Sequence, residues 1–263
     1  MKLIAQTFDI LQPEGYTMND VFRQIERCAR TCYKSEDRIT NSGAEKFVDK
    51  LIASGHVAML EHGTIYLSTT NKDIGERYEK NKYSEALFYE GVYYITTNYR
   101  VVLSNRWTKD LVFMSEPTLH IRRATVKITT NRQVANEFVR HRVFSFAQES
   151  TRFCNYSKGK FGKELTFVKP WWWSESKWIK RAICWLHLWS VEKIYMLLVR
   201  IGCSAQEAAQ ILPNATKTEL VMTGTDWDHF FDLRVHGVTG RPHPQAQDIA
   251  IMMMYQLLDN NII

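Results

Sequence analysis

The feature that most constrains the fold is a set of short β-branched and aromatic runs, each followed by a stretch with helical periodicity. The run over residues 124–130 leads into Asn131, a residue type that caps helices, and then into a helical pattern over about 132–142. The letters Ile-Thr-Thr-Asn occur there and again at 95–98. Four residues cannot establish a repeat, so we interpret both places as a strand that ends at a capped helix.

The same patterns predict the remaining elements. Strands are expected over 2–11, 63–70, 92–97, 124–130 and 218–223. Helices are expected over 17–34 with Asn19 or Asp20 near the start, 43–54 ending at Gly55, 132–142, 171–201 as one helix or two, a short stretch ending near Leu212, 226–233 and 244–258. No shift in composition marks a domain boundary, so we expect one α+β domain.

Composition and charge narrow the classes of protein. Among 263 residues, 45% are apolar and 24% charged, which is typical of a globular chain and disfavours disorder. The net charge of +6 favours anionic partners without choosing among them. Five scattered cysteines disfavour a disulfide framework and favour a reducing, cytoplasmic location. Charged residues interrupt the apolar stretch over 171–201, so a core or interface helix is expected there rather than a membrane span.

A dense group of potential cations lies at the predicted end of the helix over 132–142. Arg140, His141 and Arg142 are adjacent, and Arg152 follows Ser150 a little further on. Such charges repel one another unless an anion compensates them, and the planar fork of arginine suits phosphate oxygens. Spacing alone leaves two alternatives open, a basic helix end facing its own dipole and a nucleic-acid-binding strip.

Arg140-His141-Arg142, seven residues and then Ser150 form a motif that resembles the RHRx7S signature of the flavin-dependent thymidylate synthases. Other segments are similar to that family in the same order: Gly55-His56 with Glu61-His62, Gln148 to Arg152, Leu212 to Thr218, Thr223-Gly224, Asp226 to Arg234, and His243 before Pro244. The matches cover most of the chain. The resemblance implies an α+β fold, a single domain with a central, mostly antiparallel sheet flanked by helices.

The resemblance also implies a reaction and its ligands. These are methylation of dUMP to dTMP, with methylenetetrahydrofolate as carbon donor, FAD as redox cofactor and NADPH as reductant. A homotetramer with shared active sites is implied, with neither a nucleic-acid polymer nor a membrane as partner. Arg234 is the expected catalytic residue, because a cation beside the uracil edge would stabilise negative charge that develops on the ring.

The expected ligand contacts fall in two groups. The expected dUMP-binding residues are Glu137, Arg140, Gln148, Glu149, Ser150, Thr151, Arg152 and Arg234. The expected FAD-binding residues are Glu61, Arg140, His141, Arg142, Val143, His229, Leu233 and His243.

The chain departs from the family pattern in several places. Ala58, Cys32 and Ala209 stand where the family often has Thr, Ser and a phosphate-binding Arg, and Thr225-Asp226 replace a longer segment that contacts the flavin. An insertion of about 70–120 separates the Glu61-His62 and Arg140 motifs. A lid, a subunit contact and a larger sheet are its three possible roles.

The sequence also bears on mechanism. No cysteine follows a proline, the context of the nucleophile in folate-only thymidylate synthases, so no cysteine nucleophile is expected. The histidines and cysteines lack metal-ligand spacing, so no metal is expected. The alternative from another class is a nucleotide- or RNA-binding protein that retains the phosphate site without catalysis. Ala209 and the short segment after Gly224 favour that alternative.

Overall fold

The computed structural model describes residues 1–40, 42–152 and 154–263. Its strands are β1 (Lys2–Ile4), β2 (Thr7–Ile10), β3 (Thr64–Thr69), β4 (Glu85–Tyr89), β5 (Val92–Asn98), β6 (Ala124–Asn131), β7 (Ser145–Gln148), β8 (Thr166–Val168) and β9 (Lys217–Gly224). Its helices are α1 (Met18–Tyr33), α2 (Ala44–Ala53), α3 (Lys72–Glu79), α4 (Tyr99–Ser104), α5 (Arg132–Phe138), α6 (Trp178–Arg200), α7 (Ala205–Ala208), α8 (Trp227–Phe231) and α9 (Pro244–Asp259). A π-helical turn, Asp232–His236, continues α8, and 3₁₀ turns include Val57–His62.

The central sheet has the strand order β2-β6-β9-β7 and is antiparallel throughout. The long pair β6–β9 runs in register from Ala124 opposite Gly224 to Asn131 opposite Lys217. Side chains alternate between faces along each strand. Leu220 and Met222 therefore enter one core, while Val221 between them packs on the opposite face.

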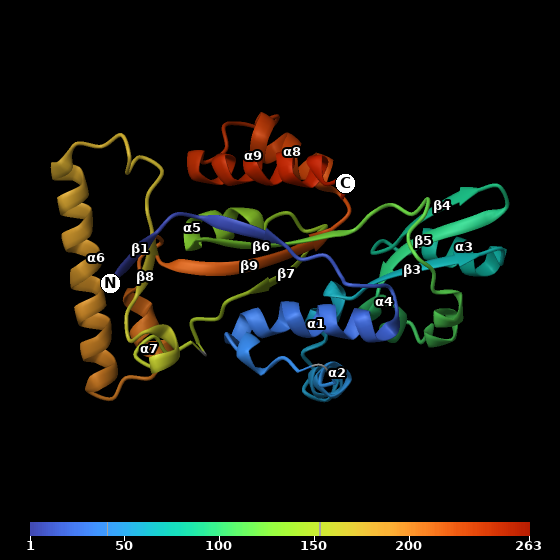
Figure 1. Ribbon diagram of the computed structural model, residues 1–263, viewed down its shortest axis with the longest axis horizontal. Coiled ribbons are helices and arrows are strands. Elements are labelled where there is room, and N and C mark those ends of the chain that lie inside the picture. The colour runs from blue at the N-terminus through green and yellow to red at the C-terminus, as the bar shows by residue number, and fades with distance from the viewer. Residues whose placement is uncertain (41, 153) are drawn as a thin grey trace.

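Helices cover both faces of this sheet. In Figure 1, α5, α8 and α9 lie above it and α1 lies below it, with α2 beyond. Apolar side chains of α5, α8 and α9 form one continuous core with β6 and β9. The α+β class with a central antiparallel sheet is thus confirmed.

A second antiparallel sheet, β3-β5-β4, lies at one end of the molecule with α3 and α4 (Figure 1). This sheet packs with α1 and α2 around a second hydrophobic core, separate from the core of the central sheet. Most of its residues belong to the expected insertion, which therefore builds a separate sheet rather than a wider central one. The division of the chain into one domain with an insertion stays a prediction.

At the other end, β1 pairs with β8 in parallel, and α6 stands along the edge of the molecule (Figure 1). By length and composition α6 is able to cross a membrane, and 22% of its 18-residue apolar window is buried within the chain. Length and composition alone therefore do not exclude a span, contrary to the sequence argument. A single helix of this kind is weak evidence for one.

The helix caps predicted from the sequence agree with the structure better than the predicted boundaries of the helices and strands do. Asn98 and Asn131 both cap helices, accepting from the amides of Val101 and Val134 at 3.1 and 2.9 Å. The run over 2–11 splits between two sheets, because β1 pairs with β8 and β2 with β6. Thr17 caps α1, and Asp20, which was expected near the start of this helix, is its third residue and the other half of a capping box. The helix expected over 132–142 ends at Phe138.

Candidate active site

Arg234 is held by two residues of the α5 segment. Its Nε donates to Nε2 of His141 at 2.8 Å, and its Nη1 donates to a carboxylate oxygen of Glu137 at 3.1 Å. The remaining Nη2 donates to the backbone carbonyl of Glu137 at 2.9 Å. Because α5 ends at Phe138, His141 lies in the turn after the helix, where its ring faces Arg234. Three of the sequence-predicted site residues are therefore in direct contact.

The electrostatics of this group keep His141 neutral. Burial lowers the pKa of His141 to about 4, and the charges of Arg234 and His229 act in the same direction. Since Nε2 accepts from Arg234, the ring proton of a neutral imidazole lies on Nδ1. Burial also lowers the pKa of Arg234, and the negative charge of Glu137 acts in the opposite direction by raising that pKa. The group thus combines one fixed cation, one carboxylate and one neutral ring.

The approach of Arg234 to α5 depends on the tight turn after β9. Trp227 is buried, and its Nε1 donates to the carbonyl of Gly224 at 3.0 Å. A Cβ on Gly224 would lie 2.5 Å from the ring of Phe144, so only glycine permits this packing without a shift. The Thr-Gly and Trp-x-His-Phe motifs therefore have a structural role, which is to dock α8 and place Arg234.

A cavity of about 880 Å³ lies between the central sheet and the second sheet. Three expected FAD contacts line it, namely Glu61, Arg142 and Val143. Much of the remaining wall comes from the insertion and its flanks, and Thr225 and Asp226 also contribute. The polar lining from the insertion and its flanks includes Asn81, Lys82, Tyr83, Asn98, Arg100, Asn105 and Arg123.

The arginines of this cavity differ in their surroundings. Arg100 forms an ion pair with Glu61. Arg123 has a structural role, because its guanidinium donates to the Glu61 carbonyl at 2.5 Å and to Ser145 Oγ at 3.0 Å. Arg142 is exposed, and within the described part of the chain its side chain has no hydrogen bond or ion pair. Arg142 is thus the arginine most able to meet a ligand.

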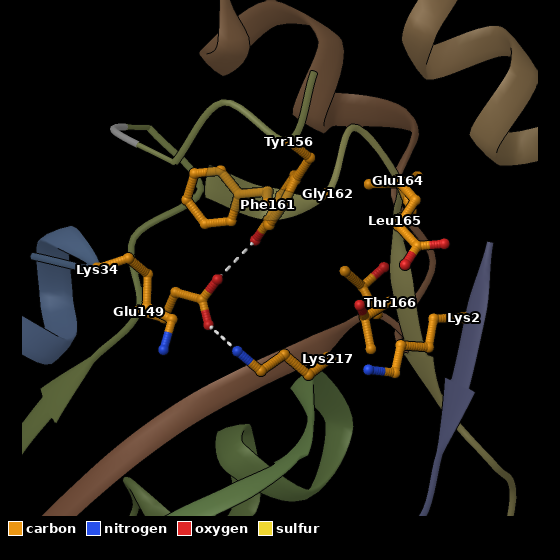
Figure 2. A pocket seen from close by; sticks show the side chains of 11 residues that line it. Lys2, Lys34, Glu149, Tyr156, Phe161, Gly162, Glu164, Leu165, Thr166 and Lys217 are labelled. Atoms are coloured by element: carbon orange, nitrogen blue, oxygen red, sulfur yellow. Dashed lines mark hydrogen bonds and ion pairs between the residues drawn. The ribbon is translucent and has the colours of Figure 1, made fainter. Parts of the chain in front are cut away.

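Glu149 lies in a different place, beside a cavity of about 320 Å³ (Figure 2). Its side chain accepts from the Tyr156 hydroxyl at 3.1 Å and from Lys217 Nζ at 2.8 Å. Lys217 also bonds Glu219 at 2.6 Å. Burial opposes ionisation of Glu219, yet Lys217 and Lys34 lower its pKa to about 2. Glu149 is therefore neutralised within a buried ion-pair network, rather than presented to solvent.

The other expected dUMP contacts follow in the next turn. Gln148 donates to Thr218 Oγ1 at 3.3 Å, and the amide of Ser150 donates to the carbonyl of Cys32 at 3.0 Å. The hydroxyl oxygen of Ser150 accepts from the amide of Arg152 at 3.3 Å. Thr151 is half-buried beside them.

The remaining expected FAD contacts are spread around α8 and α9. His229 is exposed on α8, with its ring centroid 6.4 Å from that of His141. Leu233 is half-buried in the π-helical turn, and His243 precedes α9 with a buried Nδ1 that has no partner among the described residues. Arg140 is exposed, whereas its neighbour His141 is buried. One chain therefore does not gather all the expected residues into a single pocket.

Several residues at these sites were not expected from the sequence. Lys217 and Tyr156 hold Glu149, and Asn98 and Asn105 line the large cavity. Lys217 stands at a variable position of the Leu212 to Thr218 segment, and its place in β9 brings it to Glu149. His62 is fully buried, and its Nδ1 lies 2.8 Å from Thr223 Oγ1. This contact joins the Glu61-His62 segment to the Thr223-Gly224 segment. In the described residues no group of three metal-ligating side chains comes together.

Comparisons with known proteins agree with the motifs. A family model described as thymidylate synthase complementing protein matches residues 98–259. A probable flavin-dependent thymidylate synthase of Paramecium bursaria Chlorella virus 1 is 27% identical over 137 residues, covering 45% of this chain and 60% of the relative. A flavin-dependent thymidylate synthase of Synechocystis is 29% identical over 130 residues, again with 45% and 60% covered. The chain thus spans about 60% of the length of these curated relatives.

Two crystal structures of the UMP/dUMP methylase PolB from Streptomyces cacaoi, bound with 5-Br dUMP and 5-Br UMP, each give a TM-score of 0.49. Their sequence identities are 14% and 13%, with 98% of this chain and 93% or 92% of the other chain covered. The family model extends over more than half of the chain, from the end of β5 to the end of α9. The chain therefore belongs to the thymidylate synthase complementing protein family, in agreement with the resemblance of its motifs.

Proposed function

We propose that this protein methylates dUMP to dTMP, with FAD as redox cofactor, methylenetetrahydrofolate as carbon donor and NADPH as reductant. The working form is a cytoplasmic homotetramer in which neighbouring subunits complete each site. The observation that carries the proposal is the contact of Arg234 with Glu137 and His141. Arg234 ends the Asp226 to Arg234 segment and His141 belongs to the RHRx7S motif, so the contact joins two segments of the family resemblance.

Arg234 has the role of a positioned cation. Its guanidinium is fixed by three hydrogen bonds, so it would meet the uracil edge with little loss of side-chain freedom. A fixed cation favours negative charge on the pyrimidine ring as a bond forms at carbon 5. The neutral His141 supports this role because it orients the guanidinium without adding charge repulsion.

The large cavity fits FAD by the chemistry of its lining. Arg142 offers an exposed guanidinium for diphosphate oxygens, and Asn98, Ser104 and Asn105 offer neutral polar groups for ribose and ring edges. Its volume of about 880 Å³ lies in the range of cofactor sites. Glu61, Arg142 and Val143 would hold the group from the family motifs. When bound, FAD supplies the reducing equivalents that complete the methyl group.

The cysteines support a route without a thiol nucleophile. Burial raises the pKa of Cys28 to about 12 and that of Cys32 to about 11. A thiol with a raised pKa is protonated at neutral pH and is a poor nucleophile. Cys32 lies beside the expected dUMP residues, because its backbone carbonyl accepts from the amide of Ser150. Its thiol is therefore close to that segment and is a poor nucleophile.

The proposal is tested by product formation. Purified protein is incubated anaerobically with dUMP, methylenetetrahydrofolate and excess dithionite, with and without FAD, and the nucleotide is identified by mass. We expect dTMP only when FAD is present, with no dTMP from Arg234→Ala and normal dTMP from the exposed control Arg38→Ala. If dUMP and FAD both bind and no dTMP forms, the chain is a nucleotide-binding protein and the proposal fails.

FAD binding is measured separately, by quenching of flavin fluorescence. Arg142→Ala removes a charge-assisted contact, so we expect about tenfold weaker binding or more. Arg38→Ala should bind FAD as the unmodified protein does. Equal affinity in all three proteins would remove FAD from the large cavity, whatever the result with dUMP.

A further inference from the structure

Helix α6 packs on the rest of the chain through a narrow stripe. Among its side chains only Leu188, Val191, Glu192 and Tyr195 are buried, and they recur at the spacing of one helix face. Figure 1 shows the helix at the edge of the molecule, with the rest of the chain on one side of it. The opposite side of α6 therefore has no partner within the described chain.

The outward side carries a continuous aliphatic row, which we call the α6 seam. It consists of Ile179, Ile183, Leu186, Ile194 and Leu197 on the helix, Ile201 directly after the helix end, and Ser190 at the centre of the row. The exposed fractions of its six aliphatic residues run from 49% at Ile194 to 69% at Ile201. Spacings of four, three and four positions repeat every 11 residues, which is close to three helical turns, so the row stays nearly parallel to the helix axis. The seam is about 33 Å long at 1.5 Å per residue, a large apolar strip for an isolated surface.

The α6 seam is symmetric about Ser190. Leu186 and Ile194 lie four residues to either side of it, and the two outer pairs lie seven and eleven residues away. Ser190 is the small member of the row, and its hydroxyl donates to the His187 carbonyl of the same helix at 2.7 Å. Its polar group is thus satisfied, and a second helix can approach closely at this point.

We propose that the α6 seam binds the same seam of a second copy of this chain. The two helices run antiparallel, with a twofold axis at Ser190. Leu186 then packs on Ile194 of the other copy, and Ile183 on Leu197, so each contact occurs twice. The inference deepens the homotetramer of the proposed function by naming one of its contact surfaces, and it does not depend on the reaction.

A helix of a second copy suits this surface better than a lipid bilayer. At about 3.6 residues per turn, Lys193 and Arg200 fall between the seam and the row of Trp178, Trp185 and Trp189. A bilayer that covered both rows would bury these two cations, which is costly. A single helix on the seam leaves them at the rim, with their charges in water.

Cysteine pairs test the geometry directly. In a background where Cys32, Cys184 and Cys203 are replaced by serine, Ser190→Cys should oxidise to a covalent dimer. Leu186→Cys alone should not, because antiparallel copies place those residues about 12 Å apart along the axis. A mixture of Leu186→Cys and Ile194→Cys proteins should cross-link. A parallel pair would link Leu186→Cys to itself, and no linkage at Ser190→Cys would mean that no copy lies there. Either result overturns the proposal.

The mass in solution gives an independent readout. Light scattering should show an oligomer that loses subunits on Ile194→Glu and is unchanged by Val112→Glu, a control at a residue that is 81% exposed. A monomer that sediments with vesicles of phosphatidylcholine and phosphatidylglycerol through the seam would make a membrane the occupant and overturn the proposal. Formation of dTMP by a monomer would also overturn the seam contact, while the proposed reaction would stand. If an oligomer that depends on the seam forms no dTMP, the proposed reaction fails and the seam contact stands.

Discussion

Arg234 and His141 are 93 residues apart in the chain, yet Nε of Arg234 donates to Nε2 of His141 at 2.8 Å. This bond joins the π-helical turn after α8 to the turn after α5. It fixes both the direction of a cation and the tautomer of a ring. The rest of the Arg234 guanidinium is bound to Glu137, so the orientation of this arginine depends on its fork as well as its charge.

Arg234→Lys is therefore expected to impair dTMP formation although the charge is kept. A lysine ammonium cannot bond His141 and both groups of Glu137 with the planar geometry of arginine. Loss of one charge-assisted bond corresponds to a fall of about 10- to 100-fold in kcat/KM. Steady-state kinetics with dUMP as the varied substrate measures it, with circular dichroism to check the fold. Activity equal to that of the unmodified protein would show that charge alone is sufficient.

His62 gives a prediction for stability against pH. Burial lowers its pKa to about 3, and the charge of Arg123 acts in the same direction. Above about pH 6.5 the ring is neutral in both the folded and unfolded states, so the folded state is not penalised. As pH falls, the unfolded state takes up the proton first, and stability is lost between about pH 6.5 and pH 3. At pH 5 this residue should lower the free energy of unfolding by about 2 kcal/mol.

Urea unfolding at pH 7.5 and pH 5 measures the effect. The variant His62→Asn, which keeps a polar group near Thr223, should lose about 2 kcal/mol of the difference between the two pH values. The variant His187→Gln, changed at an exposed position on α6, should leave the difference as it is in the unmodified protein. If His62→Asn shows the same pH difference as the unmodified protein, then the His62 ring takes up its proton equally in the folded and unfolded states.

The sequence was sufficient where a signal is local. The strand pattern of β6 and the caps at Asn98 and Asn131 depend on neighbours within four residues, and both are confirmed. β4 was missed because its side chains are mostly exposed, so it has no buried alternation to detect. β8 has three residues and is held by parallel pairing with β1 at the other end of the sequence. No window of sequence contains such a partner.

The candidate site divides in the same way. On the family resemblance, Arg234 and Glu137 were expected at dUMP and His141 at FAD, and the fold brings the three residues into contact. The contact of Glu149 with Lys217 spans 68 residues, and Lys217 stands at a variable position of its segment, so the sequence could not show that this carboxylate is already paired. The insertion wall of the large cavity was also beyond reach, because tertiary packing alone brings Asn98 and Asn105 beside Arg142.

Lys217→Met is expected to destabilise the fold strongly. The side chain of Glu149 is 1% exposed, and Lys217 is the cation that pairs with it. Glu219 keeps Lys34 at 2.5 Å and Lys127 at 3.0 Å, so the cost comes mainly from Glu149. Breaking a buried pair by removing one partner costs about 3–5 kcal/mol. Urea unfolding should show this loss for Lys217→Met and almost none for Lys72→Met, whose lysine is 77% exposed in its pair with Glu76. Similar losses in both variants would show that the network at Glu149 is solvated.

Gly224→Ala should lower stability through a single steric contact. The new Cβ would lie 2.5 Å from the Phe144 ring, so either the ring or the end of β9 must shift. Overpacking of this kind costs about 1–3 kcal/mol, and it should also weaken FAD binding because Thr225 and Asp226 line the large cavity. Phe144→Leu in the Gly224→Ala background removes the atoms that clash and should recover part of the loss, whereas Phe144→Leu alone only destabilises. Gly159→Ala is the matched control, since a Cβ there has no neighbour within 4 Å. If Phe144→Leu fails to recover any stability in the double variant, the glycine is required for a reason other than the approach of that ring.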